Sequence, residues 1–299
     1  MKQERSSGAP VSKAILITGC SSGIGKATAL RLLKGSARNG WTVWASARKR
    51  EALAELEAAG CRTVALDVND EGSMIRAVKE VEAAHGAVGV LVNNAGYAQS
   101  GAIEAVPMER VIRQFQTNVF GLARLTQLVL PRMRAQRWGR IVNLSSMGGK
   151  LVFPGAGFYH ATKYALEAIS DALRFEVRGF GIAVVLIEPG LIKSGFGDAA
   201  AAELSIEGGE AYGAFHEALT RASKDLYEKG FLSHLTGVPD DVARAIERAI
   251  TARSPRSRIT VSPSAKLLLT QRALLSDDLW DGMMRMSFPS PGDDSRTSV

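Results

Sequence analysis

The fold is decided by the stretch Ala14-Ile15-Leu16-Ile17-Thr18-Gly19-Cys20-Ser21-Ser22-Gly23-Ile24-Gly25, in which an apolar run is followed by a glycine-rich turn. The apolar run predicts a buried strand, and the residues after the turn, through Leu33, predict a helix. Glycines let the backbone approach a pyrophosphate closely, and free N–H groups at the start of a helix favour negative charge. The stretch therefore predicts a phosphate cradle, with an ordinary glycine turn as the alternative. Its contacts would come from Gly19, Ser21, Ser22, Gly23, Ile24 and Gly25.

The second predicted strand, residues 41–47, ends at Arg48-Lys49-Arg50. At this point a dinucleotide site recognises the adenosine ribose: an acid binds the 2′-hydroxyl of NAD, whereas an arginine accommodates the 2′-phosphate of NADP. The chain offers basic residues here and no acid. We therefore expect NADP(H) to be preferred over NAD(H), with Arg48 as the contact because a guanidinium binds phosphate bidentately. A solvated basic turn is the alternative.

Apolar runs and helical patterns alternate along the rest of the chain. Further strands are predicted at residues 63–66, 89–92, 140–146 and 182–187, with an edge strand at 258–261 and one helix over about 266–286. This alternation predicts an α/β fold: a single-domain, Rossmann-type, doubly wound parallel sheet with helices on both faces. We expect one domain over residues 13–286, and disordered tails at residues 1–12 and 287–299.

The composition excludes several classes of protein. The 299 residues include 37 basic and 30 acidic side chains, and the basic ones are spread along the chain, so we expect no nucleic-acid binding. Cys20 and Cys61 form neither a disulfide framework nor a metal-binding spacing, and the four histidines are scattered, so no metal site is expected. No apolar run approaches the about 18 residues of a membrane span. We expect a cytoplasmic protein.

Tyr159 and Lys163 lie one turn apart on a predicted helix and share one face. A free phenol has a pKa of about 10, and a fixed cation nearby favours the phenolate. Ser146 ends the predicted strand 140–146, at the edge of the sheet where open α/β proteins do their chemistry. Its hydroxyl could bind a substrate oxygen beside Tyr159, although Ser145 and Ser146 could instead cap a turn.

Six motifs, in this order along the chain, resemble those of the short-chain dehydrogenase/reductase family. The resemblance covers about residues 13–262 and is greatest to the branch of hydroxysteroid dehydrogenases, retinol dehydrogenases and acyl-dihydroxyacetone-phosphate reductases. The motifs are Thr18-Gly19-X3-Gly23-Ile24-Gly25, Asn93-Asn94-Ala95-Gly96, Asn118, Ser146, Tyr159-X3-Lys163 and Pro189-Gly190.

The resemblance implies a role for each matching residue. Tyr159 would be the general acid in ketone reduction, or the base in alcohol oxidation, and Ser146 would hold the carbonyl. Lys163 would lower the pKa of the tyrosine and bind the nicotinamide ribose, while Asn118 would position a water in the proton relay. Other cofactor contacts would come from Asp67 and Val68 at the adenine, Asn93, Ala95 and Gly96 along the ribose, and Pro189, Gly190, Ile192 and Ser194 at the carboxamide. Residues 34–40 depart from the resemblance, because they make the link between the first helix and the second strand a few residues longer than usual, and we expect a surface loop there. The resemblance also implies a homodimer or homotetramer.

Residues 191 to about 236 interrupt the alternation of strands and helices and carry many apolar side chains. They predict a mobile lid over a lipophilic substrate, and the alternative is a pair of short surface helices. Together the motifs predict an NADP(H)-dependent oxidoreductase that transfers a hydride between nicotinamide and the carbonyl or secondary alcohol of a steroid, retinoid, acyl-lipid or similar substrate. The alternative is a non-catalytic dinucleotide-binding sensor or scaffold, against which the complete set of Ser146, Tyr159 and Lys163 argues.

Overall fold

The computed structural model describes residues 11–195, 204 and 210–291, and its centre is a seven-stranded parallel sheet in the order β3-β2-β1-β4-β5-β6-β7. The order reverses between β1 and β4, as in a doubly wound fold. The structure confirms two predictions: the sheet is parallel, and the last strand lies at its edge. The strands are β1 (Ala14–Ile17), β2 (Thr42–Ala47), β3 (Arg62–Ala65), β4 (Val90–Asn93), β5 (Gly139–Leu144), β6 (Ile182–Pro189) and β7 (Arg258–Val261).

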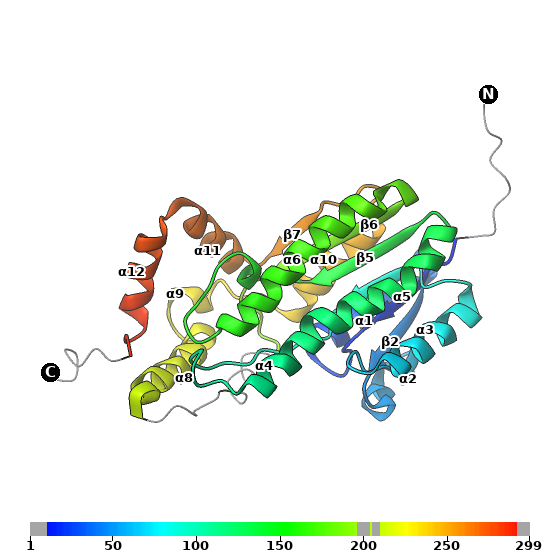
Figure 1. Ribbon diagram of the computed structural model, residues 1–299. Helices are drawn as coiled ribbons and strands as arrows, with labels where there is room; N and C mark the ends of the chain where they lie inside the picture. Colours follow the sequence, from blue (N-terminus) through cyan, green and yellow to red (C-terminus); the bar gives the residue numbers. More distant parts are fainter. Residues whose placement is uncertain (1–10, 196–203, 205–209, 292–299) are drawn as a thin grey trace.

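Helices cover both faces of the sheet, so the central strands are buried on both sides. Ile15 and Ile17 pack into the core under α1 and α10, whereas Ala14 and Leu16 pack into the core under α3, α5 and α6. Figure 1 shows α5 and α6 crossing the near face of the sheet. These helices are α1 (Gly23–Asn39), α3 (Glu71–His85), α5 (Leu122–Ala135), α6 (Gly157–Val177) and α10 (Pro239–Thr251). Shorter helical segments are η1 (Arg50–Leu53), α2 (Ala54–Ala58) and η4 (Arg178–Phe180).

The helix that carries Asn118 is continuous but not uniform. It begins as α4 (Met108–Phe115), widens into the π-helical segment η2 (Gln116–Gly121) and continues as α5. Gly121 allows η2 to touch the segment that follows β3, because a Cβ on Gly121 would collide with the Val68 carbonyl oxygen. Such π-helical segments occur frequently at functional sites.

The predicted loop at residues 34–40 is wrong, because α1 continues to Asn39. Nothing before Gly40 breaks the helix, and Gly40 ends it with a left-handed backbone (φ 67°) while its N–H donates to Ser36 O. Arg31 fixes α1 to α10 through ion pairs with Asp240 (2.7 Å) and Glu247 (2.9 Å). The extra residues therefore lengthen the helix and leave the sheet unchanged.

The single helix predicted over residues 266–286 is also wrong, because the structure has α11 (Pro263–Leu274) followed by α12 (Asp277–Ser287). Leu275 is extended between them, and the Ser276 side chain caps α12 by accepting a hydrogen bond from Leu279 N. Acidic residues at Asp277 and Asp278 suit the start of a new helix. Figure 1 shows α11 and α12 at the end of the molecule where α8 (Gly213–Glu228) and α9 (Gly230–Ser233) also lie.

The described part of the predicted lid contains η5 (Glu210–Tyr212), α8 (Gly213–Glu228) and α9 (Gly230–Ser233), whereas residues 196–203 and 205–209 lie outside the described residues. Most of the two predicted tails, residues 1–10 and 292–299, lies outside them as well. Ser12 was predicted to be in the first tail but is buried, and its Oγ donates to Ala87 O. Phe288 follows the predicted domain end and packs beside Phe215 and Leu219. None of the described helices is long and apolar enough to cross a membrane.

Candidate active site

The candidate residues gather at one edge of the sheet. All seven strands are parallel, so their carboxyl ends lie at the same edge, and the strand order reverses between β1 and β4, which in doubly wound folds marks the ligand-binding crevice. The glycine turn follows β1, and the Asn93-Asn94-Ala95-Gly96 motif follows β4 beside it. The turn that carries Ser146 follows β5.

The backbone after β1 requires glycine. Gly19 is left-handed (φ 72°), and a Cβ on Gly25 would collide with Gly19 O. Asn94 fixes this turn, because its Nδ2 donates to Thr18 O (2.8 Å) and Gly19 O (3.0 Å). Thr18 Oγ1 in turn accepts from the backbone N–H groups of Asn94 and Ala95, each at 3.0 Å. The sequence analysis missed Thr18 and Asn94 as site residues, although both lie within its motifs.

The turn suits a phosphate group. Ser21 and Ser22 are exposed, and within the described chain the Ser22 side chain makes no capping hydrogen bond to α1. The first N–H groups of α1 are thus available to an anion. Gly23 has a φ of 55°, and a Cβ on it would stand 3.4 Å from Ser194 O. The segment after β6 therefore lies beside the glycine turn, as a site for a whole dinucleotide requires.

The rest of that segment is held by the C-terminal part of the chain. Pro189 ends β6, and a Cβ on Gly190 would stand 2.6 Å from Ser262 Oγ. Ile192 is buried and pairs with Gly237 in an isolated bridge. Ile192 is thus a packing residue in this structure, and Ser194, two residues later, lies at the crevice.

Arg48 follows β2 at the same edge and is exposed. Its neighbour Arg50 is engaged, since it pairs with Glu57 (2.9 Å) and its Nε donates to Thr63 Oγ1 (3.1 Å). We find no ion pair for Arg48 within the described residues. Of the two arginines, Arg48 is the one whose guanidinium is available to an incoming anion.

The residues at the ends of β3 and β4 offer mainly backbone atoms to the candidate site. Asp67 Oδ1 accepts from Asn69 N (2.9 Å), and Val68 is buried in the core. Asn93 is also buried, and its Nδ2 donates to Thr126 Oγ1 (3.1 Å) and Asn143 Oδ1 (2.9 Å). Asn93 therefore links neighbouring elements through its side chain. Ala95 and Gly96, which follow it, are at the crevice.

Asn118 joins the η2 segment to the crevice. Its Nδ2 donates to Tyr97 O (2.9 Å) and Thr162 Oγ1 (3.1 Å), and its Oδ1 accepts from Tyr97 N (3.1 Å). A Cβ on Gly96 would stand 3.0 Å from Asn118 Oδ1 and 4.0 Å from Lys163 Nζ. The structure thus brings Gly96, Asn118 and Lys163 together, and it adds Thr162, which sequence reasoning missed within the Tyr159-X3-Lys163 motif.

Lys163 is buried beneath Tyr159. Its Nζ lies 5.7 Å from the centre of the tyrosine ring and donates to Leu144 O at 2.7 Å. Burial lowers the pKa of Lys163 from 10.5 to about 8, and the nearby Glu167 carboxylate opposes that effect. Tyr159 itself is only partly buried. An ammonium fixed this close to a phenol can favour its ionised form.

Ser146 begins the 3-10 turn η3 (Met147–Gly149) at the end of β5. Its Oγ accepts from Gly148 N (3.1 Å) and lies 3.5 Å from Pro189 O. The turn-capping role is therefore present in the structure. Because the second contact is long, the hydroxyl proton can turn to another acceptor.

His160 fixes this turn against α6. It is buried, its Nδ1 lies 3.0 Å from Gly148 O, and its Nε2 accepts from Phe153 N (3.3 Å). Burial lowers the pKa of His160 to about 4, so the ring is neutral at neutral pH and donates to Gly148 O through Nδ1. His160 thus holds Ser146 and Tyr159 on neighbouring, connected segments.

Two elements flank residues 150–157, which lead into Tyr159. On one side, Leu219 of α8 packs so closely that a Cβ on Gly155 would collide with it. On the other side, Trp280 of α12 is buried, donates from Nε1 to Val152 O (3.2 Å) and lies with its ring tilted against that of Phe153 (ring centres 6.1 Å apart). The approach to Tyr159 is therefore bordered by the predicted lid and by the C-terminal helix.

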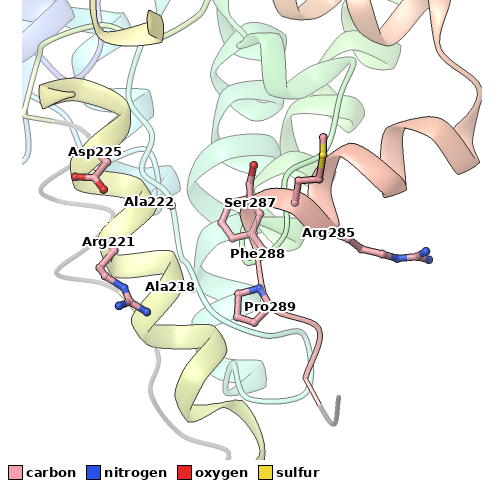
Figure 2. Close-up of a pocket in the computed structure, with 9 residues that line it drawn as sticks. Ala218, Arg221, Ala222, Asp225, Arg285, Ser287, Phe288 and Pro289 are labelled. Carbon is pink, nitrogen blue, oxygen red and sulfur yellow. The ribbon is translucent and has the colours of Figure 1, made fainter. Parts of the chain in front are cut away.

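A groove of about 520 Å³ opens between α8 and the end of α12. Figure 2 shows Arg221 and Asp225 on its α8 side and residues 287–289 across from them. The lining contains none of the candidate residues: it consists of Ala218, Arg221, Ala222, Asp225, Arg285, Met286, Ser287, Phe288 and Pro289. The crevice at the sheet edge, where the motifs meet, is thus the better candidate for chemistry.

The chain is similar to curated proteins over nearly its whole length. The probable short-chain type dehydrogenase/reductase VdlC of Helicobacter pylori is 33% identical, with 91% of this chain and 96% of that protein covered. The 3-ketodihydrosphingosine reductase of Bacteroides thetaiotaomicron is 34% identical, with 92% and 97% covered. The NADPH-dependent 3-dehydrocapnine reductase of Ornithobacterium rhinotracheale is 34% identical, with 89% and 94% covered.

Solved structures agree with the fold. A short-chain dehydrogenase from Streptomyces avermitilis has a TM-score of 0.75 and 35% identity, with 92% of this chain and 96% of that chain covered. A short-chain dehydrogenase/reductase from Burkholderia phymatum in complex with NAD has a TM-score of 0.72 and 27% identity, with 91% and 95% covered. A serine dehydrogenase complexed with NADP+ has a TM-score of 0.70 and 25% identity, with 84% and 94% covered.

The family model of short chain dehydrogenases matches residues 13–205, which contain the glycine turn and all of Ser146, Tyr159 and Lys163. With relatives that are at least 33% identical over about nine-tenths of the sequence, this match identifies the chain as an oxidoreductase of the short-chain dehydrogenase/reductase family.

Proposed function

We propose that this oxidoreductase transfers a hydride between NADP(H) and the carbonyl or secondary alcohol of a lipophilic substrate, with Tyr159 as the proton donor or acceptor. The observation that carries the proposal is the burial of Lys163 under the Tyr159 ring, 5.7 Å from its centre, with its Nζ held by Leu144 O. A buried lysine ammonium lowers the stability of the folded state, so a chemical role is the best explanation for a lysine at this position.

The chain's own residues bind the substrate and transfer the proton. When bound, the nicotinamide supplies or accepts the hydride. In the direction of reduction, Ser146 donates a hydrogen bond to the carbonyl oxygen, and Tyr159 gives its phenolic proton to the same oxygen. The Lys163 ammonium lowers the pKa of Tyr159 and binds the ribose hydroxyls. Asn118, held by Tyr97 and Thr162, positions a water behind Lys163 that returns the proton.

Arg48 supports NADP(H) as the preferred cofactor. It is exposed at the end of β2, where the adenosine ribose of a bound dinucleotide would lie, and Arg50 beside it is occupied by Glu57. Among the similar structures, one carries NADP+ and another carries NAD, so the family as a whole uses both. The basic residue at this position favours the 2′-phosphate.

A lipid-like ketone is the substrate class that we favour. The segments around Tyr159 contain apolar side chains that pack together, including Phe153, Leu219 and the C-terminal Trp280. Two relatives are named as reductases of 3-ketodihydrosphingosine and 3-dehydrocapnine, which supports the same class. A cytoplasmic location and a homodimer or homotetramer, which the sequence analysis predicts, are part of this proposal.

The test is the decay of NADPH absorbance, with NADH in parallel, against ketones of increasing alkyl length. We expect turnover with NADPH that increases with chain length and is lost in Tyr159→Phe, while that variant still binds NADPH. Equal turnover by Tyr159→Phe would refute the role of the tyrosine. NADPH binding without turnover of any carbonyl would favour the alternative, a dinucleotide-binding sensor.

A further inference from the structure

Ser262 has a backbone conformation that serine seldom adopts. It stands between β7 and α11, and its φ of 85° with a ψ of 150° falls in a region that is essentially restricted to glycine. A strained residue of this kind persists only where the surrounding structure fixes it, and such residues cluster at functional sites. The contacts of Ser262 therefore indicate which feature of the molecule depends on this turn.

Two serine hydroxyls lie together at the turn. Ser262 Oγ accepts from Ala265 N (3.3 Å) at the start of α11, and it lies 2.9 Å from Ser264 Oγ. Ser264 is fully buried, and its Oγ accepts from Leu191 N (3.2 Å) in the segment after β6. A hydroxyl can donate and accept at the same time, so the contact between the two oxygens fixes both side chains. We call Ser262 and Ser264 the serine pair.

The serine pair contacts both ends of the chain between β6 and α10. Ser264 binds Leu191 through its hydroxyl, and its backbone N–H donates to Leu235 O (3.2 Å). The two ends also bind each other, because Gly237 N donates to Leu191 O (2.8 Å) and Lys193 N donates to Gly237 O (2.9 Å). The backbone of Leu191 is thus held by Gly237 and by Ser264.

The segment held in this way, residues 189–194, runs between two parts of the candidate site. At its start, Pro189 O lies 3.5 Å from Ser146 Oγ. At its end, Ser194 O would stand 3.4 Å from a Cβ on Gly23 in the glycine turn. A dinucleotide with its phosphates at the glycine turn and its reactive ring near Ser146 would therefore lie along this segment.

We propose that Ser264, fixed by Ser262, is a positioning residue for the nicotinamide half of the bound dinucleotide: its hydroxyl holds the backbone of residues 189–194 beside that half. This role rests on the proposed function, in which the crevice binds NADP(H). Without the hydroxyl, Leu191 N loses its partner, and the segment has to be ordered when the cofactor binds, which lowers affinity. Capping of α11 does not account for Ser264, because its hydroxyl bonds to Leu191 outside that helix.

The test compares NADPH with 2′,5′-ADP, which carries the adenosine and the 2′-phosphate but no nicotinamide. Ser264→Ala should weaken NADPH binding about fivefold to tenfold, the effect of one lost hydrogen bond, and leave the affinity for 2′,5′-ADP unchanged. Both dissociation constants are measured by isothermal titration calorimetry at one pH. Equal losses of affinity for the two ligands, or no loss for either, would overturn the proposal.

Ser276→Ala is the matched control. The Ser276 hydroxyl caps α12 by accepting from Leu279 N (3.4 Å), so this variant also removes a serine hydroxyl from the start of a C-terminal helix. Its partner lies in α12 and not in residues 189–194. We expect wild-type affinities for both ligands. A loss of NADPH affinity as large as that of Ser264→Ala would assign the effect to a general loosening of the C-terminal helices and would contradict the proposal.

Ser262→Gly separates positioning from stability. Glycine adopts this backbone conformation without strain and costs little at a helix cap, so the variant should unfold at the wild-type temperature or above. It removes the hydroxyl beside Ser264 Oγ, so NADPH affinity should nevertheless fall, by about twofold to fivefold. Wild-type NADPH affinity, or a loss of affinity that accompanies a loss of stability, would count against the serine pair as a positioning device.

Hydrogen exchange examines the serine pair without cofactor. Peptides that contain Leu191 should exchange faster in Ser264→Ala, whereas peptides of the glycine turn should keep the wild-type rate. If the wild type bound neither nucleotide, the proposed function would fail, and faster exchange would still support the hold of Ser264 on residues 189–194. If Ser264→Ala does not fold, Ser264→Cys keeps the size of the side chain with a weaker acceptor and should show the same changes. Wild-type exchange at Leu191 in the variant would refute the inference.

Discussion

Lys163→Met should make the protein more stable while it abolishes activity. The lysine is buried, and its Nζ donates to Leu144 O at 2.7 Å. Methionine is of similar length and apolar, so it fits the same space without a charge. The expected sign is the reverse of the usual effect of a core substitution, which makes the prediction easy to refute.

The magnitude follows from the pKa. Burial lowers the pKa of Lys163 from 10.5 to about 8. At about 1.4 kcal/mol per pKa unit, the buried ammonium costs the folded state about 3 kcal/mol. Methionine leaves Leu144 O without this donor, which costs about 1 to 2 kcal/mol. The variant should therefore be more stable by about 1 to 2 kcal/mol at pH 7.

The pH dependence gives the sharper test. Below pH 8 the lysine is protonated in both the folded and the unfolded states, and its cost is present in full. Between pH 8 and 10.5 the folded state releases the proton while the unfolded state keeps it, so the stability of the wild type rises relative to the variant. Urea unfolding at pH 7, 8, 9 and 10 measures the difference in unfolding free energy between the two proteins, in which other titrating groups cancel. A difference that does not change with pH would refute the assignment of a buried, charged Lys163.

Three further predictions concern the cofactor, the substrate and the assembly. Arg48→Ala should weaken NADPH binding about tenfold to a hundredfold and leave NADH binding nearly unchanged, because the charge-assisted hydrogen bonds to the 2′-phosphate are lost. Equal losses of affinity for both nucleotides in binding titrations would contradict this prediction. Arg50→Ala, which removes the ion-pair partner of Glu57, is the matched control. Trp280→Ala should raise the KM for long ketones more than it lowers kcat, because Trp280 contacts Val152 and Phe153 in the segment that leads to Tyr159. Trp280→Phe should have a KM close to that of the wild type. A wild-type KM in both variants would exclude α12 from the substrate site. Phe175→Glu should reduce the molar mass of the oligomer measured by light scattering, because Phe175 is 85% exposed on α6, a helix that we expect to pair with the same helix of a second subunit. An unchanged molar mass would place the interface elsewhere.

The sheet and the main site motifs could be predicted because each depends on neighbours in the sequence. The run from Ala14 to Ile17 is apolar at every position, which predicts a strand buried on both faces, and the glycines after it are required by the turn itself. Tyr159 and Lys163 meet because four residues make about one helical turn. Such signals need no knowledge of the rest of the fold.

The features that could not be predicted depend on distant contacts or on competing local signals. Glu167 and Arg258 are 91 residues apart in sequence, and nothing in either segment indicates the pairing. The π-helical segment around Asn118 lies against Val68 through Gly121, a distant contact that apolar periodicity does not encode. The break before Asp277 did have a local signal, because Ser276 and two acids form a helix start, but the apolar pattern over residues 266–286 suggested one helix.

The position of Lys163 makes two independent measurements depend on one ionisation. The same burial that lowers its pKa also strengthens its effect on Tyr159, because charges interact more strongly away from water. Two pH values should therefore coincide. One is the pH at which the stability difference between the wild type and Lys163→Met begins to change, and the other is the pH at which the affinity of the protein for NADPH begins to fall. If the two pH values differed, the group that controls NADPH binding at alkaline pH would be a different one, and the burial of Lys163 would concern the stability of the fold alone.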